Sequence, residues 1–163
     1  MNAIALAETS VRDLLKQRAI IDAELRRRKI LRSSNNPIAD IAEELVAQHY
    51  NGRRAIATQA GWDVKTPAGE KLQVKAMRNA GYQRTSLSAI RSQDYDAVVV
   101  VIFNEDFNLL SALYIPRAVI EANVAHNSHV NGRIVRLSKR FMSLPGIRQL
   151  ELSDIILDAR SGA

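Results

Sequence analysis

Apolar residues recur with a helical period in two segments near the start of the chain. The first segment begins with a capping box at Ser10 to Asp13, and its apolar positions continue to about Lys29. The second begins at Asn36-Pro37, which suits a cap and a first helical turn, and runs to about His49. Asn51-Gly52 then supplies a helix-ending signal. The chain is therefore expected to open with a pair of helices.

The pattern then changes to a period of two, which is typical of a half-buried strand. Apolar and polar residues alternate over Lys71–Ala76, and a shorter run covers Trp62–Lys65. The intervening Thr66–Glu70 contains a Pro and a Gly, which favour a turn. This stretch predicts a hairpin of two strands, with Lys65 opposite Lys71.

A continuous apolar run, Ala97–Phe103, is rich in β-branched residues and predicts a central strand that is buried on both faces. Asn108–Ile115 is expected to be its hairpin partner, and Pro116 begins a helix. Weaker patterns predict a partial strand within Arg53–Ala60 and a further strand at Arg133–Phe141.

The stretch from Gly146 to Leu157 predicts a strand followed by a helix. No repeat or long linker divides the sequence, so one domain is expected over residues 1–163, with an N-terminal helical extension at 1–35 and a core at 37–115. The order of elements favours the α/β (α+β) class, with a central mixed β-sheet flanked by helices.

Length and composition narrow the class of protein. The 163 residues are 47% hydrophobic, which is enough for one globular core. The chain has no cysteine, which excludes disulfides and thiolate metal sites and fits a cytoplasmic location. No apolar run approaches the roughly 20 residues that a membrane-spanning helix needs, so no membrane partner is expected.

Basic residues are concentrated in one part of the chain. Lys16–Arg91 contains fifteen Lys and Arg residues against seven acidic ones, whereas Ser92–Ser128 contains one Arg against five acidic residues. Nucleic acid is a common partner for such a basic segment, although a basic surface without any partner fits the composition equally well. The residues of a type and position suited to phosphate contact are Arg53, Arg54, Lys65, Arg78, Arg84 and Arg91.

The predicted hairpin gathers three polar side chains on one face. If Lys65 lies opposite Lys71, then Asp63 lies opposite Gln73, and Lys75 shares their face two residues further on. A carboxylate, an amide oxygen and an ammonium in one place suit Mg²⁺ or Mn²⁺, which take oxygen ligands, with the Lys acting on water or phosphate. The same alternation also fits an ordinary solvated hairpin face.

This arrangement resembles the PD-(D/E)-x-K nuclease superfamily, which has the restriction-endonuclease-like fold. The resemblance rests on a helix–strand–turn–strand order with Asp63, nine residues, Gln73, one residue and Lys75. The preceding helix contains Ile41-Ala42-Glu43-Glu44-Leu45-Val46 and is similar to the helix that carries an acidic residue in many members. Trp62 replaces the Pro of the motif, and Gln73 stands where Asp or Glu is usual.

The resemblance implies a Mg²⁺-dependent (or Mn²⁺-dependent) endonuclease that hydrolyses DNA phosphodiester bonds in bacterial defence, restriction, repair or prophage biology. Asp63 and Gln73 would bind the metal, Glu43 would be a further ligand or orient water, and Lys75 would position water or stabilise the transition state. Duplex DNA would be the substrate, and a homodimer would serve its two strands.

The neutral Gln73 keeps an alternative open, which is a catalytically inactive nucleic-acid-binding module or subunit on the same fold. A third interpretation is a protein-interaction domain whose basic face only keeps it in solution.

Overall fold

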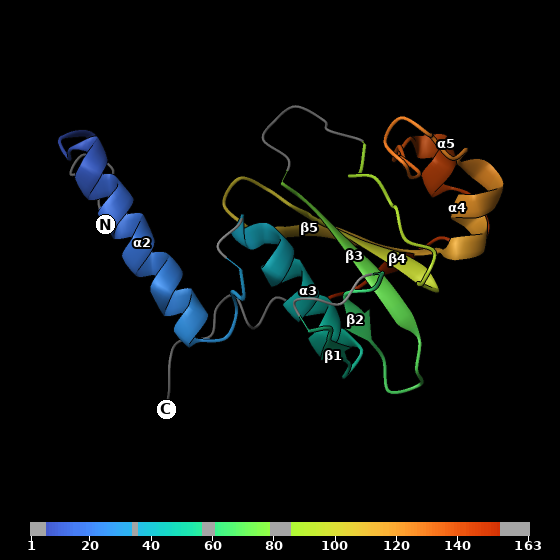
Figure 1. Cartoon of the computed structure of the whole chain (residues 1–163), viewed down its shortest axis with the longest axis horizontal. Coiled ribbons are helices and arrows are strands. Elements are labelled where there is room, and N and C mark those ends of the chain that lie inside the picture. Colours follow the sequence, from blue (N-terminus) through green and yellow to red (C-terminus); the bar gives the residue numbers. More distant parts are fainter. Residues whose placement is uncertain (1–5, 34–35, 57–60, 79–85, 154–163) are drawn as a thin grey trace.

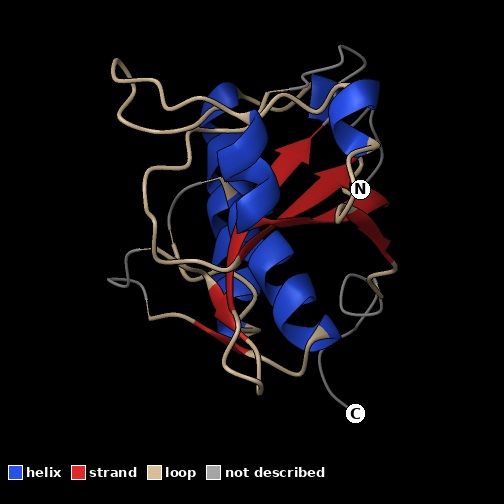
Figure 2. Ribbon diagram, turned by 90° about the vertical axis from the view of Figure 1, so that its right-hand side faces the viewer, coloured by secondary structure: helices blue, strands red, loops and turns tan. Residues whose placement is uncertain are grey.

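The computed structural model describes residues 6–33, 36–56, 61–78 and 86–153. It consists of one β-sheet with helices on both faces and a further helix to one side (Figures 1 and 2). In chain order the elements are α2 (Val11–Arg27), α3 (Pro37–His49), β1 (Arg53–Arg54), β2 (Val64–Lys65), β3 (Lys71–Arg78), β4 (Ala97–Phe103), β5 (Leu109–Pro116), α4 (Arg117–Asn123), α5 (Lys139–Met142) and β6 (Arg148–Leu150).

The six strands follow one another across the sheet in the order β1-β2-β3-β4-β5-β6. β3 and β4 are parallel, and the other neighbouring pairs in the described residues are antiparallel. α3 packs on one face of the sheet, while Ile120 of α4 and Phe141 of α5 belong to the apolar core on the other face. The predicted class is therefore confirmed as α+β with a central mixed sheet flanked by helices.

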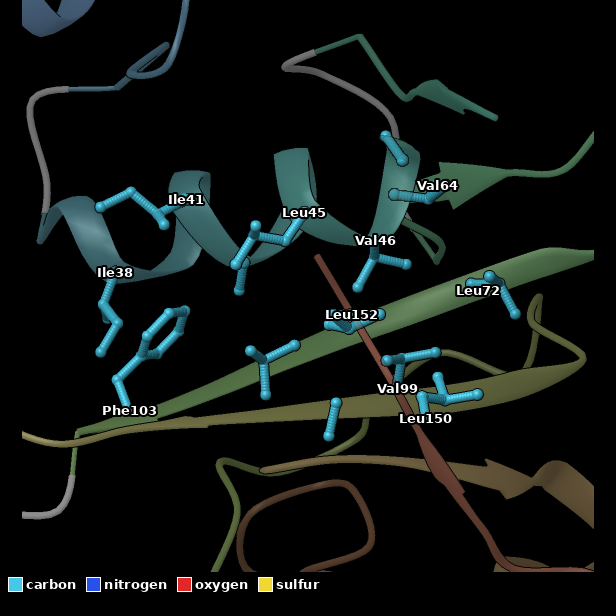
Figure 3. Packing of buried hydrophobic residues seen from close by; sticks show 14 of the residues in the cluster. Ile38, Ile41, Leu45, Val46, Val64, Leu72, Val99, Phe103, Leu150 and Leu152 are labelled. Atoms are coloured by element: carbon cyan, nitrogen blue, oxygen red, sulfur yellow. The ribbon is translucent and has the colours of Figure 1, made fainter. Parts of the chain in front are cut away.

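The core between α3 and the sheet fixes the position of α3. Figure 3 shows Leu45 and Val46 of this helix lying over Leu72 of β3 and Val99 of β4, and all four side chains are buried. Burial of each such side chain contributes about 1.5–3 kcal/mol of stability. Glu43 lies on the same helix, so this packing also places the Glu43 carboxylate.

The first predicted helix is present as α2, although it ends at Arg27 instead of Lys29. Its cap is the expected one, because the Ser10 hydroxyl accepts a hydrogen bond from the Asp13 amide at 3.2 Å. No residue of α2 is buried, and Val11 is 74% exposed. α2 therefore stands beside the sheet (Figure 1) with its apolar side chains largely uncovered.

The predicted hairpin has the predicted register. Lys65 pairs with Lys71, and Val64 pairs with Leu72. The first strand is shorter than expected, since β2 contains only two residues. Gly69 has a φ of 89°, which a residue with a side chain rarely adopts, so glycine suits this turn. β3 pairs with β2 only at Lys71 and Leu72, whereas its pairing with β4 extends to Arg78 at the end of the strand.

The predicted central strand is confirmed as β4. Six of its seven residues are buried, which agrees with a strand covered on both faces. Its antiparallel partner β5 ends at Pro116, and α4 begins directly after that residue. This strand and its two neighbours form the middle of the sheet, on which the candidate site is built.

The prediction of a strand at Arg133–Phe141 is wrong. In place of a ladder, this segment forms only isolated bridges to residues within 86–90. The Ser138 hydroxyl then accepts a hydrogen bond from the Phe141 amide at 3.1 Å and starts the short helix α5. A local helix cap therefore prevails over the alternation of apolar residues.

Two other predictions are confirmed in part. The strand expected within Arg53–Ala60 covers only Arg53–Arg54, and residues 57–60 lie outside the described part. The strand expected after Gly146 is present at Arg148–Leu150, whereas the helix expected beyond it falls on residues that are not described. Within the described ranges, no helix is long and apolar enough to cross a membrane.

Candidate functional site

Asp63 lies just before β2 and is held by three hydrogen bonds. Its amide donates to the Leu72 carbonyl at 2.8 Å, and its carbonyl accepts from the Ala55 amide at 2.7 Å. The Oδ2 atom of its carboxylate accepts a hydrogen bond from the Val74 amide at 2.7 Å. The side chain is therefore fixed, while Oδ1 makes no hydrogen bond to the described residues and is left for another partner.

Gln73 follows Leu72 on β3 and supplies the unusual feature of the site. Its side-chain oxygen Oε1 is buried and has no hydrogen-bond partner among the described residues. A buried polar atom without a partner costs about 1–3 kcal/mol, so such atoms are rare in stable folds unless water, an ion or a ligand satisfies them. Oε1 is an oxygen donor that the described protein residues leave unused.

Lys75 lies two residues beyond Gln73, on the same face of β3. Burial lowers the pKa of the Lys75 ammonium, the charge of Asp63 opposes this shift, and the charge of Arg91 adds to it. Burial likewise raises the pKa of the Asp63 carboxyl, which the Val74 amide and the Lys75 charge oppose. Each group therefore lies within the electrostatic influence of the other, as the predicted register requires.

Glu43 approaches the same place from α3. Its side chain is 16% exposed and forms an ion pair with Arg32. Burial raises the pKa of the Glu43 carboxyl to about 7, the negative charge of Asp63 adds to this shift, and the positive charge of Arg32 opposes it. Two carboxylates from different elements thus act on each other, which is a typical property of functional sites.

The site has the donor set of a hard divalent cation. The oxygens available are the carboxylates of Asp63 and Glu43 and the unused amide oxygen of Gln73, and Mg²⁺ and Mn²⁺ prefer such ligands. Among the described residues, no three Asp, Glu, His or Cys side chains gather into a metal-binding group. A metal at this place would therefore need the amide oxygen of Gln73 in addition to carboxylates.

Arg32 belongs to the site, although the sequence pattern did not single it out. One guanidinium nitrogen contacts Glu43, and a second donates to the Ala55 carbonyl at 2.5 Å. Burial raises the pKa of the Asp63 carboxyl, and the charge of Arg32 is among the influences that oppose this rise. Arg32 follows a basic cluster at the end of α2. Its partners Glu43 and Ala55 lie eleven and 23 residues further along the chain, so no local sequence pattern connects them with Arg32.

A groove of about 790 Å³ runs from Lys75 along the outer edge of β3. It lies between that strand, the beginning of α3 and one side of α2. Its wall combines cationic, hydroxyl and aromatic side chains, which include Arg18, Arg78, Ser86, Ser88 and Phe107. The guanidinium of Arg78 lies 5.0 Å from the centre of the Phe107 ring. Such a mixture suits contact with phosphates and with bases.

The residues predicted to contact nucleic acid have different surroundings. Arg53, Arg78 and Arg91 are exposed, and Lys65 is half-buried on β2. The Arg91 Nε atom donates a hydrogen bond to the Val130 carbonyl at 3.1 Å. Arg84 lies outside the described residues.

Arg54 differs from these residues because its side chain is used within the protein. It forms an ion pair with Glu44 at 3.0 Å, and it donates to the carbonyls of Lys29, Ile30 and Asp40 at 2.7–3.2 Å. Its guanidinium thus joins α3 to the segment after α2. We assign Arg54 a role in the fold and omit it from the proposed nucleic-acid surface.

Comparison with protein-family models finds no match for the chain, and comparison with curated proteins also finds none. The function is therefore inferred from the chemistry of the chain's own residues. The observations that bear on it are the paired carboxylates of Asp63 and Glu43, the unused oxygen of Gln73 and the half-buried ammonium of Lys75.

Proposed function

We propose that the protein is a Mg²⁺- or Mn²⁺-dependent endonuclease that hydrolyses DNA phosphodiester bonds in the cytoplasm, on a restriction-endonuclease-like fold of the PD-(D/E)-x-K type. The observation that carries the proposal is the buried Oε1 atom of Gln73, which has no hydrogen-bond partner among the described residues and lies on the strand that carries Lys75. A metal ligand requires an oxygen donor that the protein leaves unused, and the carboxylates of Asp63 and Glu43, which influence each other electrostatically, would supply the others.

The proposed roles follow from the surroundings of each side chain. Asp63, Gln73 and Glu43 would hold the metal, which when bound supplies a Lewis acid that polarises the phosphate. The hydrogen bond from the Val74 amide orients the Asp63 carboxylate. Lys75 presents a cationic ammonium to the water or the developing phosphate charge, and the charge of Asp63 favours its protonated form.

Duplex DNA is the proposed substrate, and a homodimer is the proposed assembly. The groove along β3 carries Arg18 and Arg78 and leads to Lys75, and Arg53 adds a further exposed cation. Two copies would cut the two strands. The exposed apolar side chains of α2 support self-association, because an uncovered apolar surface is commonly an interaction site.

The test combines metal binding with cleavage. Mn²⁺ is titrated calorimetrically into wild type and Asp63→Ala, and the same samples are then incubated with plasmid DNA. We expect Asp63→Ala to bind Mn²⁺ more weakly than wild type, and we expect nicking or linearisation only for wild type. Lys75→Met is expected to bind Mn²⁺ and DNA but not to cut.

Lys71→Met is the matched control for Lys75. Lys71 is on the same strand and also carries an ammonium, but it forms an ion pair at 2.5 Å with Asp94, which is not one of the proposed ligands. It should cut DNA at the wild-type rate. Cleavage by Lys75→Met at the wild-type rate would contradict the assignment of Lys75.

The second candidate function is a catalytically inactive nucleic-acid-binding module. The observation in its favour is Gln73 itself, because a neutral amide gives the site less negative charge than a carboxylate and weakens its attraction for a divalent cation. Binding of DNA that weakens steeply with salt, together with no cleavage in Mg²⁺ or Mn²⁺, would favour this module over the nuclease.

A further inference from the structure

We propose that Arg32 is a displaceable counter-ion of the acidic site, so that a divalent cation binds only when the ion pair between Arg32 and Glu43 opens. This inference rests on the proposed function, since it concerns the same carboxylates. It adds a residue that sets the metal affinity of the site without being a ligand itself.

The guanidinium of Arg32 is directed into the acidic site. Nη2 contacts the Glu43 carboxylate, and Nη1 donates to the Ala55 carbonyl at 2.5 Å. Nε lies 3.8 Å from the Asp40 carboxylate. Ala55 in turn donates its amide to the carbonyl of Asp63, so the guanidinium lies against the segment that pairs with Asp63. The contact is with Oε2 of Glu43, so a metal ligated by that oxygen, alone or together with Oε1, would have to displace the guanidinium.

The backbone of Arg32 is fixed by contacts that do not involve its guanidinium. The Oδ2 atom of Asp40 accepts hydrogen bonds from the amides of Arg32 and Ser33 at 3.1 and 3.0 Å, and from the Ser33 hydroxyl at 2.9 Å. Asp40 is itself buried in α3. The side chain of Arg32 can therefore leave Glu43 while the backbone keeps its position.

A comparison with Arg54 shows why Arg32 is the displaceable one of the two arginines. The Arg54 side chain is 11% exposed and bonds to three carbonyls besides its ion pair with Glu44. The Arg32 side chain is 30% exposed, and its hydrogen bond to a carbonyl is with Ala55. Arg32 therefore has a path to solvent and fewer bonds to break, whereas Arg54 is held in place.

The proposed exchange replaces one cation, the guanidinium of Arg32, with another, the divalent metal ion. A guanidinium and a divalent cation repel each other at short range in a half-buried site, and both seek the Glu43 carboxylate. Removal of the guanidinium takes away both the competitor and the repulsion. The expected direction is thus a tighter metal site without Arg32.

The experiment is a calorimetric Mn²⁺ titration of wild type, Arg32→Gln and Arg27→Gln at one pH and ionic strength. We expect Arg32→Gln to bind Mn²⁺ about tenfold more tightly: the size is that by which outer-shell residues change metal affinity, and the direction follows from removal of a competing cation. Arg27→Gln removes an equal charge from an exposed position on α2 and should bind as wild type does. Equal or weaker binding by Arg32→Gln would overturn the proposal.

The outcomes separate this inference from the proposed function. If wild type binds Mn²⁺ and Arg32→Gln binds no more tightly, only the role of Arg32 is wrong. If Arg32→Gln alone binds, the role of Arg32 is supported. If no variant binds Mn²⁺, the proposed metal site and the role of Arg32 both fail.

A second measurement needs no substitution and serves if Arg32→Gln does not fold. The guanidinium Nε–H signals of Arg32 and Arg54 are followed by NMR during a Mg²⁺ titration of wild type. We expect the Arg32 signal to move or broaden through exchange with solvent, while the Arg54 signal stays unchanged. An unchanged Arg32 signal at saturating Mg²⁺ would overturn the proposal.

Discussion

The carboxylate of Asp63 accepts a hydrogen bond from the backbone amide of Val74 at 2.7 Å, across the two strands of the hairpin. The side chain thus bonds the backbone of β3 from a position just before β2 begins. This bond couples the fold to the candidate site, because the interaction that holds the edge of β3 also orients the proposed metal ligand.

A pair of substitutions at Asp63 separates these two roles. Asp63→Asn retains an oxygen acceptor for the Val74 amide, whereas Asp63→Ala leaves that amide without a partner. We expect the Ala variant to be less stable than the Asn variant by about 1–3 kcal/mol, measured by urea unfolding without metal. Both variants should bind Mn²⁺ more weakly than wild type. Equal stability of the two variants would show that the Val74 amide finds water instead.

Replacement of Gln73 by Leu should stabilise the metal-free protein. The change removes a buried oxygen that has no partner, so the free energy of unfolding is expected to rise by about 1–3 kcal/mol, while Mn²⁺ binding is lost. Gln48→Leu on the exposed side of α3 is the control and should change stability by less than about 0.5 kcal/mol. A less stable Gln73→Leu variant would mean that Oε1 is satisfied in solution.

Gln73→Glu should have the opposite effect on the metal. A carboxylate adds negative charge to the donor set, so Mn²⁺ is expected to bind more tightly than to wild type. Without metal, the added charge at this buried position has no hydrogen-bond partner among the described residues to offset it and should lower the unfolding temperature. The two effects are measured by calorimetric titration and by thermal unfolding in the presence of a chelator.

The raised pKa of Glu43 makes the stability of the metal-free protein depend on pH. The carboxyl has a pKa of about 7 in the folded chain and 4.5 as its ordinary value, so the folded state binds the proton more tightly. The contribution of the Glu43 carboxyl to the free energy of unfolding is therefore fully present below about pH 4.5, and it is lost as pH rises through about 7. In a chelating buffer, the stability of wild type relative to Glu43→Gln should therefore fall by on the order of 1–3 kcal/mol over this range.

A flat difference between wild type and Glu43→Gln across that range is the contrary outcome. It would show that the ion pair with Arg32 outweighs burial and keeps Glu43 ionised. The same measurement on Glu44→Gln serves as a comparison, since Glu44 follows Glu43 on α3 and pairs with the well-held Arg54.

Neighbouring arginines on β1 should respond differently to substitution. Arg54→Met leaves Glu44 and several carbonyls without their partner, and it should lower the free energy of unfolding by about 3 kcal/mol. Arg53→Met removes an exposed side chain and should change stability by less than about 0.5 kcal/mol. Chemical unfolding of both variants tests the pair. Similar losses at the two positions would contradict the structural role given to Arg54.

The bounds of the shortest strands were beyond sequence-based prediction, although their approximate places were predicted. β1 and β6 are too short for an alternating pattern to repeat, so they form because the hairpin and β5 offer edges with which to pair. The strand predicted at Arg133–Phe141 is absent for the opposite reason. This segment has an alternating pattern, but it finds only isolated bridge partners within residues 86–90. Pairing between strands depends on neighbours that a local pattern does not specify.

What the sequence by itself determined is the set of features that act within a few residues along the chain. Helix caps, the turn before Lys71 and the alternation of apolar residues led to α2, α3, the central strand and the hairpin register that brings Asp63 near Lys75. Only the tertiary structure decided which atoms are left without partners and which are paired over long distances, namely Oε1 of Gln73, Arg32 and Arg54. The reason is that their surroundings are built from segments that are distant in the chain and that meet only in the folded core, where α3 packs on the sheet.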